Sequence, residues 1–220
     1  MLFPTIRWVL IGLLLAIAIA CGLWGGGDNR IDVALVRAGI AARAAHPSAT
    51  TAGMILNIVG GVTVTIGLAI AAAIALWRSG RVRDAGAFIA ILISGRLVIE
   101  AIKLLVRRAR PALDPHPVVT HSLSFPSAHV ANSMMFFGAL ALVSASPRHC
   151  RPALITAVLA SVLVGASRPL LGVHWPSDVV AGWAFGAAWL LLWWTKLDGL
   201  ARREVQHDVV RGHRAPGVER

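Results

Sequence analysis

Long runs of apolar residues constrain this chain more than any other feature. Apolar residues make up 57% of its 220 residues and charged residues 14%, whereas about 25% of an average soluble domain is charged. A helix of about 20 residues crosses the hydrocarbon of a bilayer. Six stretches approach or exceed this length: residues 5–24, 54–77, 86–106, 127–146, 152–168 and 178–197. The sequence therefore predicts an all-α, polytopic membrane bundle of six transmembrane helices.

The first stretch also has features of a signal peptide, because Arg7 precedes the apolar run and small residues precede Cys21. The apolar region of a signal peptide is usually about 7–15 residues long. This run is longer, so we expect an uncleaved span. Residues 199–220 are polar and predict a cytoplasmic tail after a membrane domain that ends at residue 198.

Basic residues between the spans predict their orientation. With both termini in the cytoplasm, twelve Lys and Arg residues fall on the inner side and seven on the outer side, as the positive-inside rule favours. The net charge of +11 lies in short clusters that flank spans, which argues against nucleic-acid binding. Cys21 and Cys150 would lie on opposite faces, so we expect no disulfide between them.

Residues 31–44 predict a short helix in the outer interface. Ile31 and Leu35 share one helical face, and Asp32 and Arg43 lie off it. A plain connector and a role in substrate entry both fit this pattern.

Lys103 and Arg110 form the first of three polar clusters, all predicted at the outer face. Their spacing of seven residues is close to two helical turns, so both side chains project on one side of a helix. Pro111 ends that helix. A basic collar that extends to the interface is the alternative interpretation.

The second cluster opens the fourth stretch with Pro126, Ser127, Ala128 and His129. Proline suits the first position of a helix. The free N–H groups of that turn, together with the Ser127 hydroxyl, can bind an anion. His129 can donate a proton from there, or it can serve as a structural hydrogen-bonding group.

The third cluster contains Arg168, His174 and Asp178, and Pro176 marks the start of a helix between the last two. A carboxylate four residues after a histidine can hold one ring nitrogen and leave the other free to attack. An interaction with the helix dipole is the alternative role for Asp178.

Together the clusters bring three basic side chains and two histidines to one membrane face. Fixed positive charges of this kind stabilise the transition state of phosphoryl transfer without a metal. Metal binding is the competing interpretation, because His116 and His121 share this side. No carboxylate or cysteine completes a ligand set at the usual spacing. The residues alone leave open which of the two clustered histidines would attack.

The clusters resemble the signature of the type-2 phosphatidic acid phosphatase superfamily, to which vanadium haloperoxidases also belong. Its motifs are Lys, six residues, Arg-Pro; then Pro-Ser-Gly-His; then Ser-Arg, five residues, His, three residues, Asp. Here they read Lys103…Arg110-Pro111, Pro126-Ser127-Ala128-His129 and Ser167-Arg168…His174…Asp178. The resemblance covers about residues 86–185 and departs at Ala128, which stands in place of Gly. A methyl group is tolerable in a helical turn with negative φ, so we expect modest tuning.

The resemblance implies a role for each matched residue. His174 would attack phosphorus and form a phosphohistidine, Asp178 would orient His174, and His129 would protonate the leaving oxygen. No metal or other cofactor is implied. The residues that would hold the phosphoryl oxygens are Lys103, Arg110, Ser127, Ala128 and Arg168.

The expected function is a metal-independent phosphatase at the outer face of the inner membrane. Its substrate would be a lipid phosphate or diphosphate in the bilayer, such as phosphatidic acid, phosphatidylglycerol phosphate or undecaprenyl diphosphate. A lipid phosphotransferase of the same family would use the same residues. A transporter that binds an anionic headgroup without catalysis is a further alternative. The oligomeric state is not predicted.

Overall fold

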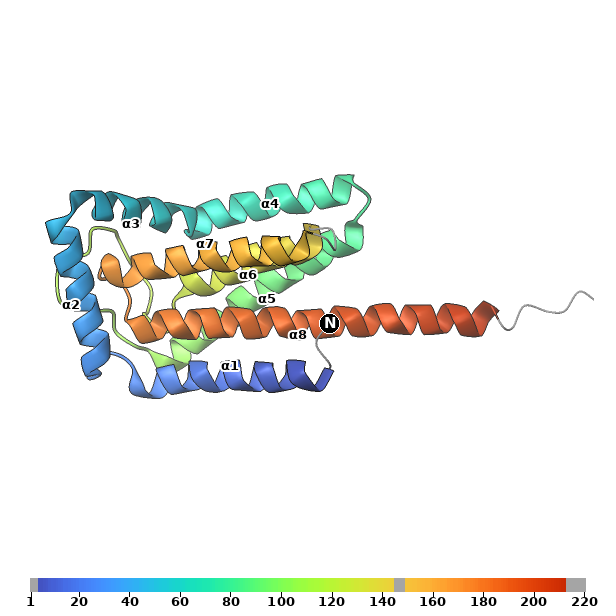
Figure 1. Cartoon of the computed structure of the whole chain (residues 1–220), viewed down its shortest axis with the longest axis horizontal. Coiled ribbons are helices and arrows are strands. Elements are labelled where there is room, and N and C mark those ends of the chain that lie inside the picture. The colour runs from blue at the N-terminus through green and yellow to red at the C-terminus, as the bar shows by residue number, and fades with distance from the viewer. Residues whose placement is uncertain (1–3, 145–148, 213–220) are drawn as a thin grey trace, which may run out of the picture.

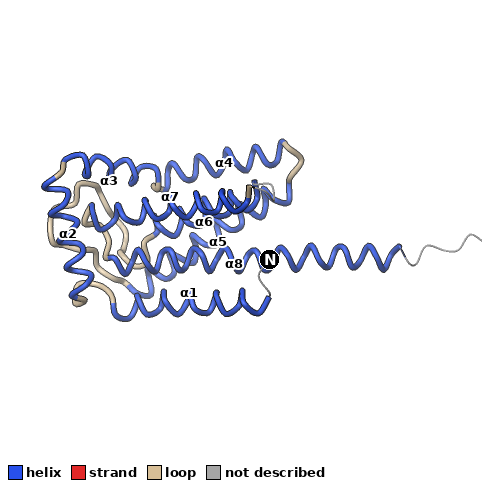
Figure 2. The backbone as a smooth tube through the Cα atoms, in the orientation of Figure 1, coloured by secondary structure: helices blue, strands red, loops and turns tan. Residues whose placement is uncertain are grey.

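The computed structural model describes residues 4–144 and 149–212, which form eight helices and, within these ranges, no strand (Figure 2). The prediction of an all-α fold is confirmed. In chain order the helices are α1 Pro4–Trp24, α2 Arg30–Ala45, α3 Pro47–Val59, α4 Val62–Arg78, α5 Val82–Val106, α6 Ala128–Ser144, α7 Cys150–Leu170 and α8 Pro176–Gly212.

Helix α2 crosses one end of the bundle, and the other helices run roughly lengthwise, with α3 and α4 bent by 45° to each other (Figure 1). Helix α1 packs along α8, and α6 lies against α5, α7 and α8. Helix α1 begins, and α8 ends, at the end of the bundle away from α2 (Figure 1). Cys21 and Cys150 are both free.

The outer surface of the bundle is apolar. Large side chains remain exposed along several helices, among them Val9 at 65%, Leu97 at 65% and Leu105 at 82%. A contiguous surface of this kind suits contact with lipid rather than water. Inside the bundle Phe88 and Phe136 meet edge to face with ring centroids 6.0 Å apart, and Trp189 Nε1 donates to Ile91 O at 3.1 Å. The chain is a multi-pass membrane protein.

Length and composition mark individual spans. Within the described residues, α1 and α7 are each long and apolar enough to cross a membrane, and α3 with α4 could form a third span that is bent by 45°. Helix α6 is apolar but shorter, and α5 carries charged side chains along its length. The count of six spans stays a prediction. The end of the expected fourth span, residues 145 and 146, lies outside the described residues.

The expected second span, residues 54–77, is broken in the structure. Helix α3 ends at Val59 and α4 begins at Val62. A Cβ on Gly60 would lie 2.5 Å from Val164 Cγ1 on α7, so the glycine permits close packing of this break against α7.

Helix α2 confirms the short helix that was expected over residues 31–44. Asn29 caps it by accepting from the N–H groups of Ile31 and Asp32. Asp32 is buried, whereas Ile31 and Leu35 are 70% and 50% exposed, so the apolar face turns away from the bundle.

Helix α8 also covers part of the expected C-terminal tail. Helix α8 continues through Gly212, so the expected boundary at residue 198 falls inside a helix. Polar residues such as Arg and Glu are good helix formers, which explains why polar composition alone did not predict the helix end. Residues 213–220 lie outside the described residues.

Candidate active site

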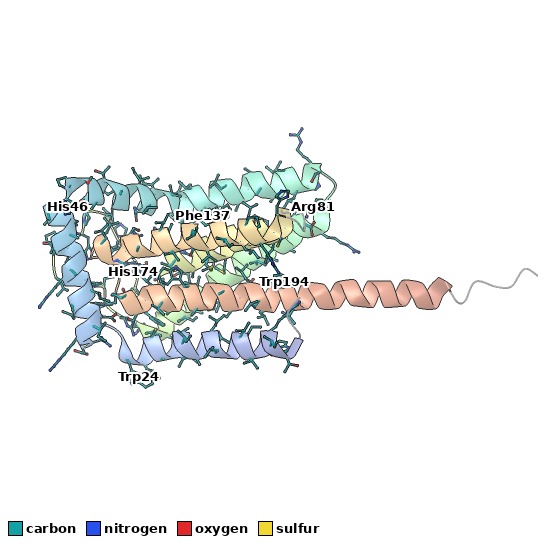
Figure 3. The ribbon with its side chains drawn as sticks, viewed as in Figure 1. Trp24, His46, Arg81, Phe137, His174 and Trp194 are labelled. Carbon is teal, nitrogen blue, oxygen red and sulfur yellow. The ribbon has the colours of Figure 1, made fainter. Side chains whose placement is uncertain are left out.

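The loop between α7 and α8 positions His174. Gly172 adopts φ +73°, a conformation that favours glycine, and the N–H of Val173 returns to Arg168 O at 3.1 Å. The turn places His174 at the α2 end of the bundle, away from the end at which Arg81 lies (Figure 3). Asp178 follows in the first turn of α8.

Asp178 is fully buried and has four polar partners. Arg108 Nη1 donates to Oδ1 at 2.8 Å. Ser124 Oγ at 2.5 Å and the backbone N–H of Trp175 at 3.0 Å both donate to Oδ2. His174 Nδ1 lies 3.4 Å from the same oxygen. The carboxylate is therefore held rigidly beside one ring nitrogen of His174.

The other ring nitrogen of His174 faces Arg110. Arg110 Nη1 lies 3.0 Å from His174 Nε2 and donates to Val173 O at 2.7 Å. A guanidinium can only donate hydrogen bonds, so Nε2 must offer its lone pair and Nδ1 must carry the proton. This tautomer directs the Nδ1 proton toward Asp178 and leaves the Nε2 lone pair on the side of Arg110.

Burial governs the ionisation of His174. Desolvation lowers the pKa of its imidazole to about 3, the Asp178 hydrogen bond opposes this shift, and the charges of Arg110 and Arg168 add to it. His174 is therefore neutral at neutral pH. Burial also lowers the pKa of Arg110, and the Asp178 carboxylate acts in the opposite direction.

Lys103 and Arg110 converge on the segment before α6. Lys103 is 2% exposed, and its Nζ donates to Leu123 O. Arg110 Nε donates to Ser122 O at 2.7 Å and Nη2 donates to Ser122 Oγ at 3.1 Å. The oxygens that accept from both cations are uncharged. These contacts therefore do not neutralise the positive charges of Lys103 and Arg110.

Arg168 and Ser127 each keep a donor that no protein atom meets. Arg168 is 1% exposed, and Asn57 Oδ1 accepts from its Nη1 and Nη2 at 3.0 Å each. Its Nε, like Ser127 Oγ, is buried without a hydrogen-bond partner. A buried polar group left unpaired costs about 1–3 kcal/mol. Two such donors suit an acceptor-rich anion.

Ala128 and His129 open α6. The Ser127 N–H donates to Asp178 O at 3.0 Å, and the first bond of the helix runs from Ala131 N–H to Ser127 O at 3.0 Å. The N–H groups of Ala128 and His129 precede that bond, as in any helix N-terminus that can bind an anion. His129 is partly exposed, and its ring lies within electrostatic range of Arg168, His174 and Arg110.

All eight residues expected in the site thus lie at one end of the bundle, on α5, α6, α7, α8 and the adjoining loops. Three partners of these residues were not predicted: Arg108 and Ser124, which donate to Asp178, and Asn57, which accepts from Arg168. Asn57 had a signal, because a lone amide in an apolar stretch is costly without a partner. No feature of the sequence distinguishes Arg108 from its neighbour Arg107.

The histidines of the competing metal interpretation do not form a cluster. His116 Nε2 lies 2.8 Å from Pro111 O, and His121 is exposed. Among the described residues, no group of three His, Cys, Asp or Glu side chains converges.

A buried acid–histidine pair and three basic side chains thus lie together at one end of a helical membrane bundle. The family model of the PAP2 superfamily matches residues 84–201. The chain belongs to this superfamily, and the resemblance inferred from the motifs is confirmed.

Relatives and a solved structure extend this comparison. The chain is 35% identical over 114 residues to a lipid A 1-phosphatase of Rhizobium johnstonii, covering 48% of this chain and 44% of that protein. It is 40% identical over 129 residues to a decaprenylphosphoryl-5-phosphoribose phosphatase of Mycobacterium tuberculosis, covering 54% and 64%. The chain thus spans about half the length of these relatives.

The crystal structure of a transmembrane PAP2-type phosphatidylglycerolphosphate phosphatase from Bacillus subtilis matches with a TM-score of 0.73 and 26% identity. The match covers 90% of this chain and 96% of that one.

Proposed function

We propose that this protein is a metal-independent lipid phosphate phosphatase that works through a phosphohistidine at His174. The observation that carries the proposal is the arrangement around this side chain. Asp178 lies beside Nδ1 at 3.4 Å, and a guanidinium donor lies 3.0 Å from Nε2. The same site contains unpaired donors on Arg168 and Ser127.

The reaction would proceed in two displacements. The Nε2 lone pair of His174 attacks phosphorus, the bond from phosphorus to the leaving oxygen breaks, and His129 gives its proton to that oxygen. Asp178 stabilises the positive charge that develops on the imidazole. Water then attacks the phosphohistidine, His129 accepts a proton from the water, and the Nε2–P bond breaks. The products are inorganic phosphate and the lipid without its terminal phosphate, which is an alcohol from a monophosphate and a monophosphate from a diphosphate.

The remaining residues would hold the phosphoryl oxygens. Lys103, Arg110 and Arg168 supply three positive charges, and the Ser127 hydroxyl and the Ala128 N–H supply neutral donors. Their positions are set before the reaction, so little reorganisation is needed when charge develops in the transition state. Ala128 is the first residue of α6, so its N–H is among the groups that have no partner within the helix.

Membrane setting and relatives support a lipid substrate. The relatives are named for lipid A, decaprenylphosphoryl-phosphoribose and phosphatidylglycerolphosphate, and the apolar surface of the bundle suits delivery of a lipid by lateral diffusion. We place the site at the outer face of the inner membrane with both termini in the cytoplasm. The distribution of basic residues supports this orientation.

The test is phosphate release by purified protein in detergent that contains a chelator. Phosphatidic acid, phosphatidylglycerophosphate and undecaprenyl diphosphate are offered in parallel, with His174→Ala and, as a control, His46→Ala, which replaces an exposed histidine at the end of α2. We expect release by the parent protein and by the control, and none by His174→Ala. Absence of release from every lipid, or an undiminished rate in His174→Ala, would refute the proposal.

A further inference from the structure

Two buried carboxylates lie at the α2 end of the bundle, and the proposed mechanism uses one of them. Among the residues that the structure describes, Asp32 and Asp178 are the only buried aspartate or glutamate side chains, at 3% and 0% exposure. Asp32 belongs to α2 and precedes residues 84–201, which the family model matches. A buried charge is costly unless it is paired, so the partners of Asp32 indicate its role.

The groups that donate to Asp32 are neutral. Its Oδ1 accepts from the Ser177 N–H at 2.9 Å, and its Oδ2 accepts from the Gly26 N–H at 2.6 Å and from Ser177 Oγ at 2.5 Å. Ser177 lies in the first turn of α8, directly before Asp178. Asp32 therefore binds the residue next to Asp178 through both its main chain and its side chain.

The Ser177 hydroxyl connects Asp32 to a cation. Arg108 Nη1 donates to Ser177 Oγ at 3.1 Å and to Asp178 Oδ1 at 2.8 Å. A hydroxyl has one proton and two lone pairs. Because the proton is donated to Asp32, the lone pairs are available to Arg108. The guanidinium therefore lies between two buried carboxylates, in contact with Asp178 and linked to Asp32 by one hydroxyl.

The loop between α1 and α2 permits this close approach. A Cβ on Gly25 would lie 2.0 Å from Ser177 Oγ, so a larger residue would displace the hydroxyl. Gly26, whose N–H binds Asp32, has φ +111°, a conformation that favours glycine. The backbone of this loop is thus fitted to the contact between Asp32 and Ser177.

We propose that Asp32 is a positioning residue of the active site. Its carboxylate orients the Ser177 hydroxyl, and the hydroxyl fixes the Arg108 guanidinium. The guanidinium in turn holds Asp178 beside His174. This inference rests on the proposed phosphatase function and extends its machinery to a helix that lies outside the three sequence motifs.

The test compares Asp32→Asn and Arg108→Lys, alone and combined, in the full-length protein. Steady-state kinetics below the unfolding transition of every variant give kcat and KM for the fastest substrate among phosphatidic acid, phosphatidylglycerophosphate and undecaprenyl diphosphate. In Asp32→Asn we expect kcat to fall about fivefold, the worth of one hydrogen bond, with KM little changed. Because Asp32 acts through Arg108, adding Asp32→Asn to Arg108→Lys should lower kcat no further.

Two further variants separate positioning from stability. Ser177→Ala removes the bridging hydroxyl and keeps the Asp32 carboxylate, so it should also lower kcat about fivefold. It decides the matter if Asp32→Asn does not fold. Asn29→Ala removes the cap of α2 and keeps every group that donates to the Asp32 carboxylate, so it should lower thermal stability without changing kcat.

The positioning role and the phosphatase function fail in different ways. An unchanged kcat in Asp32→Asn or Ser177→Ala, or an equal loss of kcat in Asn29→Ala, would overturn the positioning role while the phosphatase function stands. Losses that multiply in the double variant would overturn it too, because Asp32 would then act independently of Arg108. No phosphate release by the parent protein from any of the three lipids would overturn the phosphatase function and, with it, the role of Asp32.

Discussion

Arg108 Nη1 lies 2.8 Å from Asp178 Oδ1, with the two side chains 9% and 0% exposed. The same guanidinium donates to the carbonyl oxygens of Cys21 and Gly22 at 2.8 Å each, and it stacks over the Phe125 ring at 4.6 Å. Arg108 therefore joins the end of α1 to the carboxylate that lies beside His174.

Replacing Arg108 tests this link. Lysine cannot reproduce the forked donors or the stacking of a guanidinium, so Arg108→Lys should lower kcat by about tenfold or more, with a smaller change in KM. The matched control is Arg107→Asn, at an exposed neighbour with φ +51° where asparagine is well tolerated. The control should retain the parent rate. Similar losses in both variants would remove Arg108 from the positioning of Asp178.

Asn57 sets the position of Arg168 through its side-chain oxygen. Asn57→Leu removes this acceptor and leaves more buried guanidinium donors unpaired, so we expect KM for the lipid to rise about tenfold. Asn57→Asp keeps an oxygen at this position and should retain more activity than Asn57→Leu. Steady-state kinetics on the same lipid measure whether Asn57→Asp is more active than Asn57→Leu. Equal activity of the two variants would contradict the prediction.

Asp32 ties α2 to the start of α8. Its Oδ1 accepts from the Ser177 N–H at 2.9 Å, and its Oδ2 accepts from Ser177 Oγ at 2.5 Å and from the Gly26 N–H at 2.6 Å. Asp32→Asn should lower the free energy of unfolding by about 1–3 kcal/mol, because an amide nitrogen cannot accept these bonds. Asp28→Asn, at an exposed carboxylate, serves as the control. Thermal unfolding followed by tryptophan fluorescence should separate the two variants.

The pKa of His174 predicts how acid affects stability. The unfolded imidazole has a pKa near 6.5 and the buried one about 3, so protons bind preferentially to the unfolded chain between these values. The contribution of the neutral His174 imidazole to the free energy of unfolding is fully present above about pH 6.5 and is lost as the pH falls toward 3. At pH 4.5 this group alone costs about 3 kcal/mol.

His174→Gln removes this titration. The parent protein should therefore lose more thermal stability than His174→Gln between pH 7.5 and pH 4.5, with other acid effects common to both proteins. Equal losses in the two proteins would show that folding does not lower the pKa of His174.

The sequence predicted the pairing of His174 with Asp178 because a spacing of four residues across a helix start is a local property. The sequence could not predict that Arg108 rather than Arg107 contacts Asp178. The two positions carry the same residue type, and only the backbone conformation after the end of α5 decides which side chain faces Asp178. Arg107 adopts a left-handed conformation at that end, and this turn directs the next side chain inward.

The sequence alone also could not predict contacts between segments that are far apart along the chain. Asn57 and Arg168 are 111 residues apart and meet only because α3 packs against α7. The break between α3 and α4 had a local signal in the Gly60-Gly61 pair, yet an apolar run of residues 54–77 reads as one span by hydropathy alone. The extension of α8 to Gly212 was missed for a similar reason, because composition reports polarity rather than helix length.

The most direct test of the central claim is detection of the phosphohistidine itself. Full-length protein is mixed with lipid that carries a ³²P-labelled scissile phosphate, quenched in alkali within milliseconds, and analysed for label on the protein. The account predicts an alkali-stable, acid-labile label that maps to His174 and is absent from His174→Gln. Phosphate release by the parent protein without any such label, or a label that persists in His174→Gln, would contradict it.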